Sequence, residues 1–278
     1  MELSFTKMHG CGNDYVYINC FTQRVDDPAA LAVRLSDRHR SIGGDGVILI
    51  CPPDDAAHDA RMRMFNLDGS EGKMCGNGIR CVAEYLFTHG MAAGKKAVDV
   101  ETLAGTKHIV RRAPGLLTVD MGRADFTPAA IPLRGFHRPV VDTLVEVNGE
   151  GVRITCVSMG NPHCVVFVPD TERLDLPREG GRFEHHAMFP EGVNTEFIQV
   201  LDKTHLKMRV WERGSGETMA CGTGACASVA AACACGVCEK GTDVDVQLRG
   251  GTLTIRCTDR TVLMTGEAVT AFEGTVQV

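Results

Sequence analysis

Two cysteines in this sequence are each followed directly by Gly-x-Gly and then by a run of helix-forming residues. Cys75 lies in KMCGNGIRC, residues 73–81, and Cys221 lies in MACGTGACA, residues 219–227. A cysteine at the start of a helix lies beside unpaired backbone N–H groups and the positive end of the helix dipole. That environment favours the thiolate and predicts a lowered thiol pKa. The flanking glycines also leave backbone N–H groups open to an anion such as a carboxylate.

Two thiols that face one small substrate suit the inversion of a stereocentre. One thiolate removes a proton from carbon, and the opposing thiol delivers a proton to the other face. Both helix ends would direct partial positive charge at a carboxylate on that carbon and stabilise an enolate-like transition state. This chemistry needs neither a metal nor pyridoxal phosphate, and the sequence contains no motif typical of either. We therefore expect no cofactor and no metal.

The spacing of polar residues around the two cysteines indicates an internal duplication. Asn66 precedes Cys75 by nine residues, and Glu212 precedes Cys221 by nine residues. Glu71 and Glu217 each lie four residues before their cysteine, Asn13 lies 62 residues before Cys75, and Asn161 lies 60 before Cys221. We interpret Glu71 and Glu217 as loop stabilisers that pair with backbone N–H groups. The repeated offsets predict two homologous halves that face each other across a cleft.

The hydrophobic pattern places the cysteine motifs between strands and helices. Residues 77–88 are amphipathic at helical spacing, with Gly90 as the C-cap, and residues 223–234 predict an alanine-rich helix. A further helix is expected over residues 29–37. Strands are expected over residues 15–18, 47–50, 61–66, 164–168, 194–200 and 207–211.

The composition is that of a soluble globular protein. The 278 residues are 44% hydrophobic and 23% charged, with a formal net charge of −6. A nucleic-acid partner is not expected, because phosphate contacts require clustered Lys and Arg. The N-terminus lacks the pattern of a signal peptide, and the most apolar stretch, residues 225–238, is too short to span a bilayer. We expect a cytoplasmic protein with no membrane partner and with most of its 13 cysteines reduced.

Six segments together resemble the diaminopimelate epimerase family over nearly the whole chain. They are HGCGNDYV, GGDGVILI, FNLDGSEGKMCGNGIRC, SMGNPHCV, NTEFIQV and WERGSGETMACGTGACA. The resemblance implies a cofactor-independent isomerase that interconverts LL- and meso-diaminopimelate for lysine and peptidoglycan precursor synthesis. It leaves the oligomeric state open, a homodimer included.

The resemblance also implies a fold of the α+β class with two similar, pseudo-symmetric α/β domains. Each domain would be a strongly curved sheet wrapped round a central helix, with the active site in the cleft between the domains. We place the N-terminal domain at residues 1–123 plus 267–278, because the last strand is expected to return to the first half. The C-terminal domain would be residues 124–266.

Site residues are carried over by position from the same motifs. Cys75 and Cys221 correspond to the acid/base pair. The loop residues expected to hold the substrate's amino-carboxylate group are Gly76, Asn77, Gly222 and Thr223. Other matching ligand-binding positions are Asn13, Asn66, Asn161, Asn194, Glu212 and Arg213. Arg213 suits a carboxylate and Glu212 an ammonium group.

His163 and Glu212 match positions that flank the catalytic sulfurs, where they could assist proton balance. The chain departs from the family at Gly46, where some members have Gln after the Asp of the GGDG motif, and we leave Gly46 out of the predicted site.

Other functions fit the sequence less well. A proline or hydroxyproline racemase of the same fold would use the same two cysteines, but the polar set around Glu212 and Arg213 suits a longer substrate. A thiol redox protein typically places its cysteines close together in sequence, as in C-x-x-C. A non-enzymatic binding protein would not need a cysteine in both loops.

Overall fold

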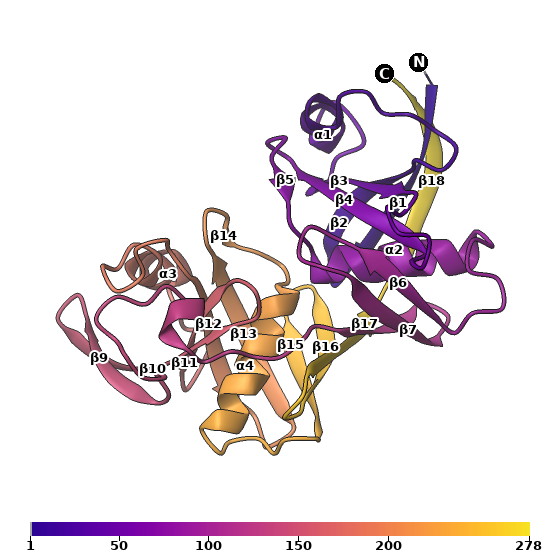
Figure 1. The fold of residues 1–278 in the computed structure, drawn as a ribbon. Coiled ribbons are helices and arrows are strands. Elements are labelled where there is room, and N and C mark those ends of the chain that lie inside the picture. Colours follow the sequence, from indigo (N-terminus) through magenta and orange to yellow (C-terminus); the bar gives the residue numbers. More distant parts are fainter. Residues whose placement is uncertain (1) are drawn as a thin grey trace. The chain divides into compact units, whose positions relative to one another are not determined.

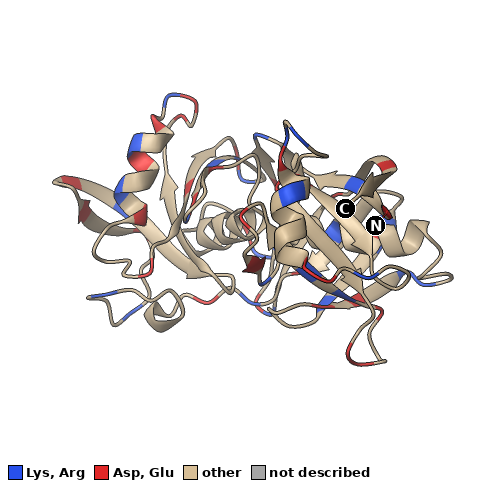
Figure 2. Cartoon of the chain, turned by 90° about the horizontal axis from the view of Figure 1, so that it is seen from above, with Lys and Arg blue, Asp and Glu red and all other residues tan. Residues whose placement is uncertain are grey.

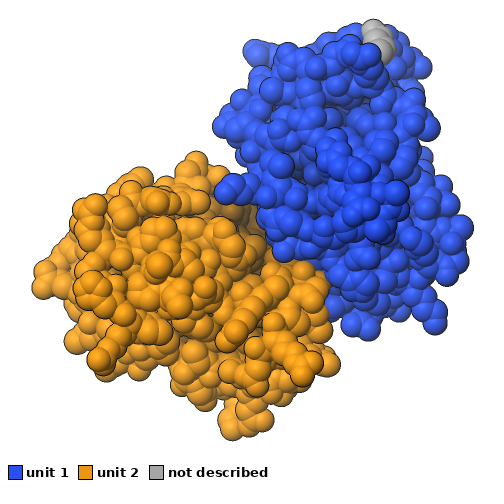
Figure 3. Space-filling view, in the orientation of Figure 1, with its two compact units in different colours: residues 1–119, 265–278 blue, residues 120–264 orange. Residues whose placement is uncertain are grey.

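The computed structural model describes residues 2–278, which form two compact units (Figure 3). Unit 1 comprises residues 1–119 and 265–278, and unit 2 comprises residues 120–264. The domain boundaries expected from the sequence, after residues 123 and 266, stay a prediction.

Unit 1 has one sheet and two helices (Figure 1). Its elements are β1 (Glu2–Gly10), β2 (Asn13–Asn19), α1 (Pro28–Ser36), β3 (Gly46–Cys51), β4 (Ala60–Asn66), β5 (Glu71–Gly72), α2 (Gly76–Thr88), β6 (Ala97–Glu101), β7 (Lys107–Ala113), β8 (Leu116–Asp120) and β18 (Val269–Gln277). Strand β1 pairs antiparallel with β2 and β18, β2 runs parallel to β3, and β3 pairs antiparallel with β4. Strand β4 pairs antiparallel with β5 and parallel with β6, and β7 joins β6 to β8 in antiparallel pairs. The expected return of the last strand to the first half is confirmed by the pairing of β1 with β18.

Unit 2 repeats this pattern of strand pairing. Its elements are η1 (Pro128–Ala130), β9 (Thr143–Val147), β10 (Glu150–Ser158), β11 (Pro162–Phe167), α3 (Leu176–Glu184), β12 (Asn194–Val200), β13 (His205–Glu212), β14 (Gly216–Glu217), α4 (Gly222–Ala234), β15 (Asp243–Leu248), β16 (Gly251–Cys257) and β17 (Val262–Glu267), whose last residues belong to unit 1. Strand β10 pairs antiparallel with β11 and β9, and β11 runs parallel to β12. Strand β13 then pairs antiparallel with β12 and β14 and parallel with β15, which pairs with β16. The two units are thus built on the same topology, as the repeated spacing predicts.

Each unit has a central helix that the curved sheet surrounds. Helix α2 packs against β1, β2, β6 and β7, and α4 packs against β10, β11, β12 and β16. Helix α2 is buried without interruption from Gly76 to Leu86, and the alanine-rich α4 is buried on nearly all sides. The C-cap residue of α2 is His89, one residue before the predicted Gly90, and Gly90 follows it in the left-handed conformation with a φ of 71°. This is the expected fold class, in which a strongly curved sheet surrounds a central helix.

A second helix covers the outer face of each sheet. Helix α1 begins at Pro28 after the N-cap Asp27, whose carboxylate accepts a hydrogen bond from the Ala30 N–H. It packs over β2, β3 and β4, and the core between them contains Val16, Ile18, Val47, Leu49 and Phe65. Helix α3 covers β12, β13 and β14 in the same way.

Two adjacent glycines in α3 differ in the space around them. A Cβ atom on Gly180 would lie 2.2 Å from Trp211 Cγ, whereas a Cβ on Gly181 would have no atom of the described residues within 4 Å. We expect Gly180→Ala to lower the free energy of unfolding by about 1–3 kcal/mol, because Trp211 must move. Gly181→Ala should raise it by up to about 1 kcal/mol through helix propensity. Urea unfolding of both variants measures the difference, and equal effects would contradict the packing of α3 on Trp211.

Charged side chains are spread over both units. Figure 2 shows Lys and Arg interspersed with Asp and Glu on the helices, strands and loops. Across residues 2–278, the structure contains no helix with the length and apolar character needed to cross a membrane.

Candidate active site

Cys75 is the N-cap residue of α2, so the helix begins at Gly76 rather than at residue 77. Its φ of −127° and ψ of 121° are extended, and its Sγ accepts a hydrogen bond from the Gly78 N–H at 3.3 Å. The thiol donates to Asn13 Oδ1 at 3.2 Å. A Cβ on Gly78 would lie 2.6 Å from Ile48 Cδ1, which explains why the second glycine of the motif is needed where the helix meets the sheet.

Asn13 connects the Cys75 loop to the β1–β2 turn. Its Nδ2 donates to Asp45 Oδ2 at 2.6 Å, and its Oδ1 also accepts from Asn77 Nδ2 at 3.5 Å. The Asn77 Oδ1 in turn accepts a hydrogen bond from Arg80 Nη2 at 2.9 Å. The predicted residues Asn13, Cys75, Gly76 and Asn77 therefore lie together at the N-terminus of α2.

Tyr15 is a site neighbour that the sequence analysis does not identify. It is 5% exposed, and burial followed by the nearby Cys75 raises the pKa of its phenol well above its usual value. Strand register places Tyr15 opposite Gly46, and Gly46 opposite Asn66. The same register in unit 2 places His163 opposite Asn194, so Tyr15 has in unit 1 the position of His163 in unit 2. The duplication itself could have revealed it, because each residue lies two positions after a predicted Asn.

The remaining predicted residue of unit 1, Asn66, lies at the end of β4. Its Nδ2 donates to Ser70 Oγ at 3.0 Å, and its side chain is partly exposed. Its role as a ligand contact stays a prediction.

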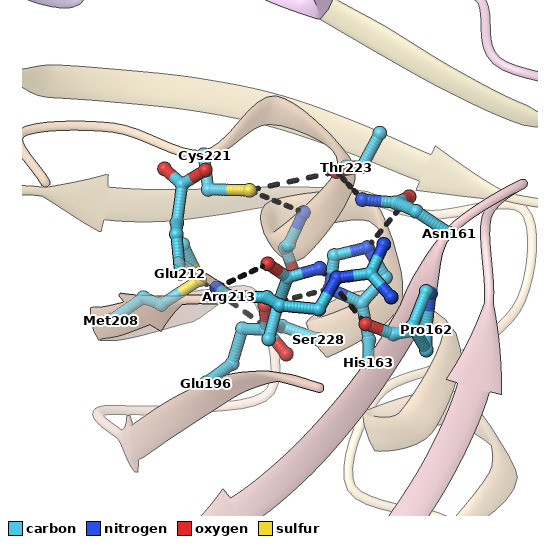
Figure 4. A network of polar contacts seen from close by, with 12 residues as sticks. Asn161, Pro162, His163, Glu196, Met208, Glu212, Arg213, Cys221, Thr223 and Ser228 are labelled. Atoms are coloured by element: carbon cyan, nitrogen blue, oxygen red, sulfur yellow. Dashed lines mark hydrogen bonds and ion pairs between the residues drawn. The ribbon is translucent and has the colours of Figure 1, made fainter. Parts of the chain in front are cut away.

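Cys221 caps α4 as Cys75 caps α2. Its Sγ accepts from the Gly224 N–H at 3.3 Å and lies 3.5 Å from Thr223 Oγ1 (Figure 4). A Cβ on Gly224 would lie 2.6 Å from Glu196 Oε1 and 3.2 Å from the sulfur of Cys221. Glycine at this position therefore lets a carboxylate and a thiol lie close together at the start of one helix.

A chain of polar contacts leads from Cys221 into the core of unit 2 (Figure 4). Asn161 Nδ2 donates to Thr223 Oγ1 at 3.3 Å, and Asn161 Oδ1 lies 3.0 Å from His163 Nε2. His163 Nδ1 lies 2.7 Å from Glu196 Oε1, and both of these side chains are fully buried. Two oxygen partners hold the imidazole ring in one orientation, which in turn orients the Asn161 amide toward the Cys221 loop. The structure thus brings together four predicted residues and adds Glu196, which the sequence analysis misses.

The predicted lowering of the thiol pKa is wrong for Cys221. Burial raises the pKa of this thiol well above its usual value, and the negative charges of Glu212 and Glu196 raise it further. Hydrogen bonds from Thr223 and the Gly224 N–H oppose these effects without outweighing them. The helix N-terminus acts in the expected direction, but the sequence does not reveal two carboxylates near a 7% exposed sulfur. Cys221 is therefore a thiol at neutral pH, ready to donate a proton.

Replacing Glu212 tests this electrostatic account. We expect Glu212→Gln to lower the pKa of Cys221, because it removes a negative charge that disfavours the thiolate. Thiolate absorbance at 240 nm, titrated with and without a second substitution Cys221→Ser, isolates the contribution of Cys221. Glu172→Gln, at an exposed carboxylate paired with Lys207, is the control and should leave the titration unchanged. An unchanged or raised pKa in Glu212→Gln would contradict the assignment.

The other predicted residues of unit 2 lie on the strands around this network. Asn194 Nδ2 donates to the Pro162 carbonyl at 2.9 Å, and Asn194 Oδ1 accepts from the Arg213 N–H at 3.0 Å. The Arg213 side chain is exposed, and its Nη1 donates to the Glu191 carbonyl at 2.9 Å. Glu212 accepts from Thr218 Oγ1. Gly222 begins α4 directly after Cys221 and is buried. Asn194 therefore fixes the position of Arg213 through its backbone.

The loops before the two cysteines are held by matching ion pairs. Arg63 Nε donates to Glu71 Oε1 at 2.7 Å, and Arg209 Nε donates to Glu217 Oε1 at 2.9 Å. Each pair has a second contact through Nη2. The predicted loop-stabilising role is thus carried by arginine side chains and not by backbone N–H groups, because Arg63 and Arg209 lie on strands that pair with the glutamate strands.

Each unit thus presents a cysteine thiol beside backbone N–H groups at the N-terminus of a buried helix. Such a site can exchange a proton with carbon and bind a carboxylate. Among residues 2–278, no group of three or more His, Cys, Asp or Glu side chains is arranged to hold a metal ion.

Comparison with known proteins places the chain in a family. The family model described as diaminopimelate epimerase matches residues 5–127 and 155–271. The chain is 52% identical to diaminopimelate epimerase of Desulfovibrio desulfuricans, covering 99% of this chain and 98% of the relative. It is 48% identical to diaminopimelate epimerase of Acetivibrio thermocellus, with the same two coverages.

The fold is also found in more distant proteins. The crystal structure of a PhzF-family phenazine biosynthesis protein from Bacillus anthracis matches with a TM-score of 0.73 at 17% identity, covering 100% of both chains. That likeness supports the two-domain fold with its curved sheets. From the family model and the full-length relatives, we conclude that this chain belongs to the diaminopimelate epimerase family.

Proposed function

We propose that this protein is an isomerase that interconverts LL- and meso-diaminopimelate by two-base proton transfer at the α-carbon. The observation that carries the proposal is the presence of a cysteine N-cap on the central helix of each unit, in a member of this family. The reaction belongs to lysine and peptidoglycan precursor synthesis, and we propose that it takes place in the cytoplasm without a cofactor.

The proposed catalytic groups are Cys75 and Cys221. In one direction the Cys75 thiolate removes the α-proton, and the Cys221 thiol donates a proton to the opposite face of the carbon. The raised pKa of Cys221 supports its role as the acid that begins this direction. After one turnover Cys75 carries a proton and Cys221 has lost one, so the reverse reaction starts from the exchanged states. His163 and Glu212 are proposed to assist, since one orients Asn161 and the other lies near Cys221.

The proposed substrate contacts follow from the chemistry of the groups at the two helix starts and on the neighbouring strands. Backbone N–H groups at the starts of α2 and α4 suit the α-carboxylate, whose charge grows toward an enolate in the transition state. Arg213 suits the distal carboxylate, and Glu212 suits an ammonium group. The full set of proposed binding residues is Asn13, Asn66, Gly76, Asn77, Asn161, Asn194, Glu212, Arg213, Gly222 and Thr223.

The experiment that tests this function compares two substrates. Purified protein is incubated separately with LL-diaminopimelate and with L-proline, and the stereoisomers are separated by chromatography. We expect meso-diaminopimelate to form and D-proline to be absent. Epimerisation of proline alone would favour the racemase alternative, and inertness toward both would refute the proposed reaction.

A further inference from the structure

A second pair of cysteines lies side by side on the sheet of unit 1, at the ends of the strands that begin near Cys75. Strand β2 runs parallel to β3 with Asn19 opposite Ile50, so the next residues, Cys20 and Cys51, are neighbours. The Cys20 N–H donates to the Ile50 carbonyl at 2.8 Å, which continues the pairing to this point. Neighbouring strands lie about 4.8 Å apart, and that separation falls within the Cα–Cα range of about 4.4–6.8 Å that a disulfide requires.

Both side chains lie on the same face of the sheet. Residues two apart on a strand share a face, so Cys20 follows Ile18 and Cys51 follows Leu49 on the side covered by α1. The hydrophobic core beneath α1 contains Cys51, and Cys20 packs against it. Cys20 is partly exposed, whereas Cys51 is 8% exposed. The two sulfurs therefore lie at the solvent edge of this core.

Two arginines on β4 lie next to the pair, on the side of Cys51 away from Cys20. Strand β4 places Arg61 opposite Cys51 and Arg63 opposite Leu49 on the same face. Arg61 Nη1 is paired with Asp54, but its buried Nε has no hydrogen-bond acceptor among residues 2–278. A cationic side chain next to a cysteine sulfur favours the thiolate over the thiol.

The electrostatics agree with this geometry. A hydrogen bond from Cys20, followed by the charges of Arg61 and Arg63, lowers the pKa of Cys51 to about 7 despite its burial. The Cys51 thiolate raises the pKa of Cys20 well above its usual value, so Cys20 stays protonated. Cys51 is therefore the activated thiol, and Cys20 remains protonated beside it.

We propose that Cys51 and Cys20 form a peroxide-reactive dithiol that closes to a reversible disulfide, separate from the two cysteines proposed for epimerisation. The Cys51 thiolate attacks one oxygen of a hydroperoxide, the O–O bond breaks, and Cys51 becomes a sulfenic acid while the leaving oxygen takes a proton. The Cys20 sulfur then attacks the Cys51 sulfur and releases water. In total two thiols and one hydrogen peroxide give one disulfide and two waters, with two electrons passing from sulfur to oxygen.

The chain contains its own control pair. Cys156 lies directly opposite Cys164 in the β10–β11 pair, but both residues are 0% exposed. Burial raises the pKa of Cys164 well above its usual value. The cysteines are therefore neighbours in both pairs. Of the two pairs, Cys20 and Cys51 form the one with an activated thiol and with access to solvent.

The test is peptide mapping of the full-length protein. Reduced protein is treated with increasing hydrogen peroxide, quenched with N-ethylmaleimide, digested and analysed by mass spectrometry. We expect a Cys20–Cys51 crosslink at doses that leave Cys156 and Cys164 fully alkylated, and its loss after dithiothreitol. Peptide mass is the readout, because oxidation of Cys75 or Cys221 would change activity for a different reason.

Three variants separate the steps. Cys20→Ser should leave Cys51 as a sulfenic acid that dimedone labels, and Cys51→Ser should leave Cys20 alkylated at the same dose. Arg61→Gln should slow crosslinking roughly fivefold, because less of Cys51 is thiolate at neutral pH. Circular dichroism checks that each variant is folded. Full alkylation of Cys20 and Cys51, or a crosslink no faster than that of Cys156 with Cys164, would overturn the proposal.

Discussion

Serine at either position 75 or 221 is expected to reduce kcat for epimerisation by about 10³-fold. A serine hydroxyl keeps the size of the side chain and can still accept a hydrogen bond from the helix N–H. It is far too weak an acid to alternate between donor and acceptor of a carbon-bound proton near neutral pH. Because both transfers are needed for inversion, Cys75→Ser and Cys221→Ser should each show the full loss, and the double variant should be little worse than either single one.

The controls are cysteines outside the proposed site. Cys20→Ser in unit 1 and Cys233→Ser in unit 2 replace partly exposed thiols and should leave kcat within about twofold of the parent. Thermal unfolding of all four single variants shows whether a loss of activity reflects loss of fold. A fully active Cys75→Ser or Cys221→Ser variant would remove that residue from the mechanism.

Glutamine at position 46 is expected to destabilise this protein by at least about 3 kcal/mol. A Cβ on Gly46 would lie 2.1 Å from the Phe65 carbonyl oxygen and 2.9 Å from the Tyr15 ring. The first contact is with backbone, so relief requires separation of β3 from β4 and not just a rotamer change. Tyr15 on β2 and Asn66 on β4 lie opposite Gly46 and would be displaced with it, so kcat/KM should fall as well.

Gly105→Gln is the matched control for this substitution. Gly105 has a φ of 85° and no atom of the described residues within 4 Å of an added Cβ, so only backbone strain is introduced. That strain costs about 1–2 kcal/mol. Urea unfolding should therefore give a much lower free energy of unfolding for Gly46→Gln than for Gly105→Gln. A smaller loss of stability in Gly46→Gln than in Gly105→Gln would show that β3 and β4 can separate at little cost.

The sequence predicts the elements that position the cysteines because their signals are local. A Gly-x-Gly motif followed by helix formers predicts the starts of α2 and α4 to within one residue. Strand β12 occupies residues 194–200, as predicted. The equal offsets in the two halves predict the repeated topology, because a duplication keeps the order of its elements.

The features that the sequence analysis misses depend on tertiary packing. Helix α3 contains Gly180 and Gly181, which favour a turn, and its formation depends on close packing against Trp211. Tyr15 is a site neighbour only through the register of β2 with β3. Glu196 is fully buried on β12, and its pairing with His163, which only the tertiary structure reveals, makes a carboxylate tolerable there.

Electrostatics is the least predictable part of the site. The sequence predicts that Cys221 lies at the positive end of a helix dipole, which favours a thiolate there. The opposing contributions, burial and the charges of Glu212 and Glu196, come from residues 9 and 25 positions away along the chain. Their sum reverses the expected direction of the pKa shift.

The most direct test of two-base chemistry is an initial-rate measurement in D₂O that starts from LL-diaminopimelate. If one thiolate takes the α-proton and a different thiol, already exchanged with solvent, delivers the new one, the first meso product carries deuterium. The recovered LL substrate keeps its protium, because the base that could return a deuteron to it still holds the substrate-derived proton. Mass spectrometry of the separated isomers at low conversion should show this asymmetry. Deuterium entering the recovered substrate as fast as the product, or protium retained in the product, would contradict the account.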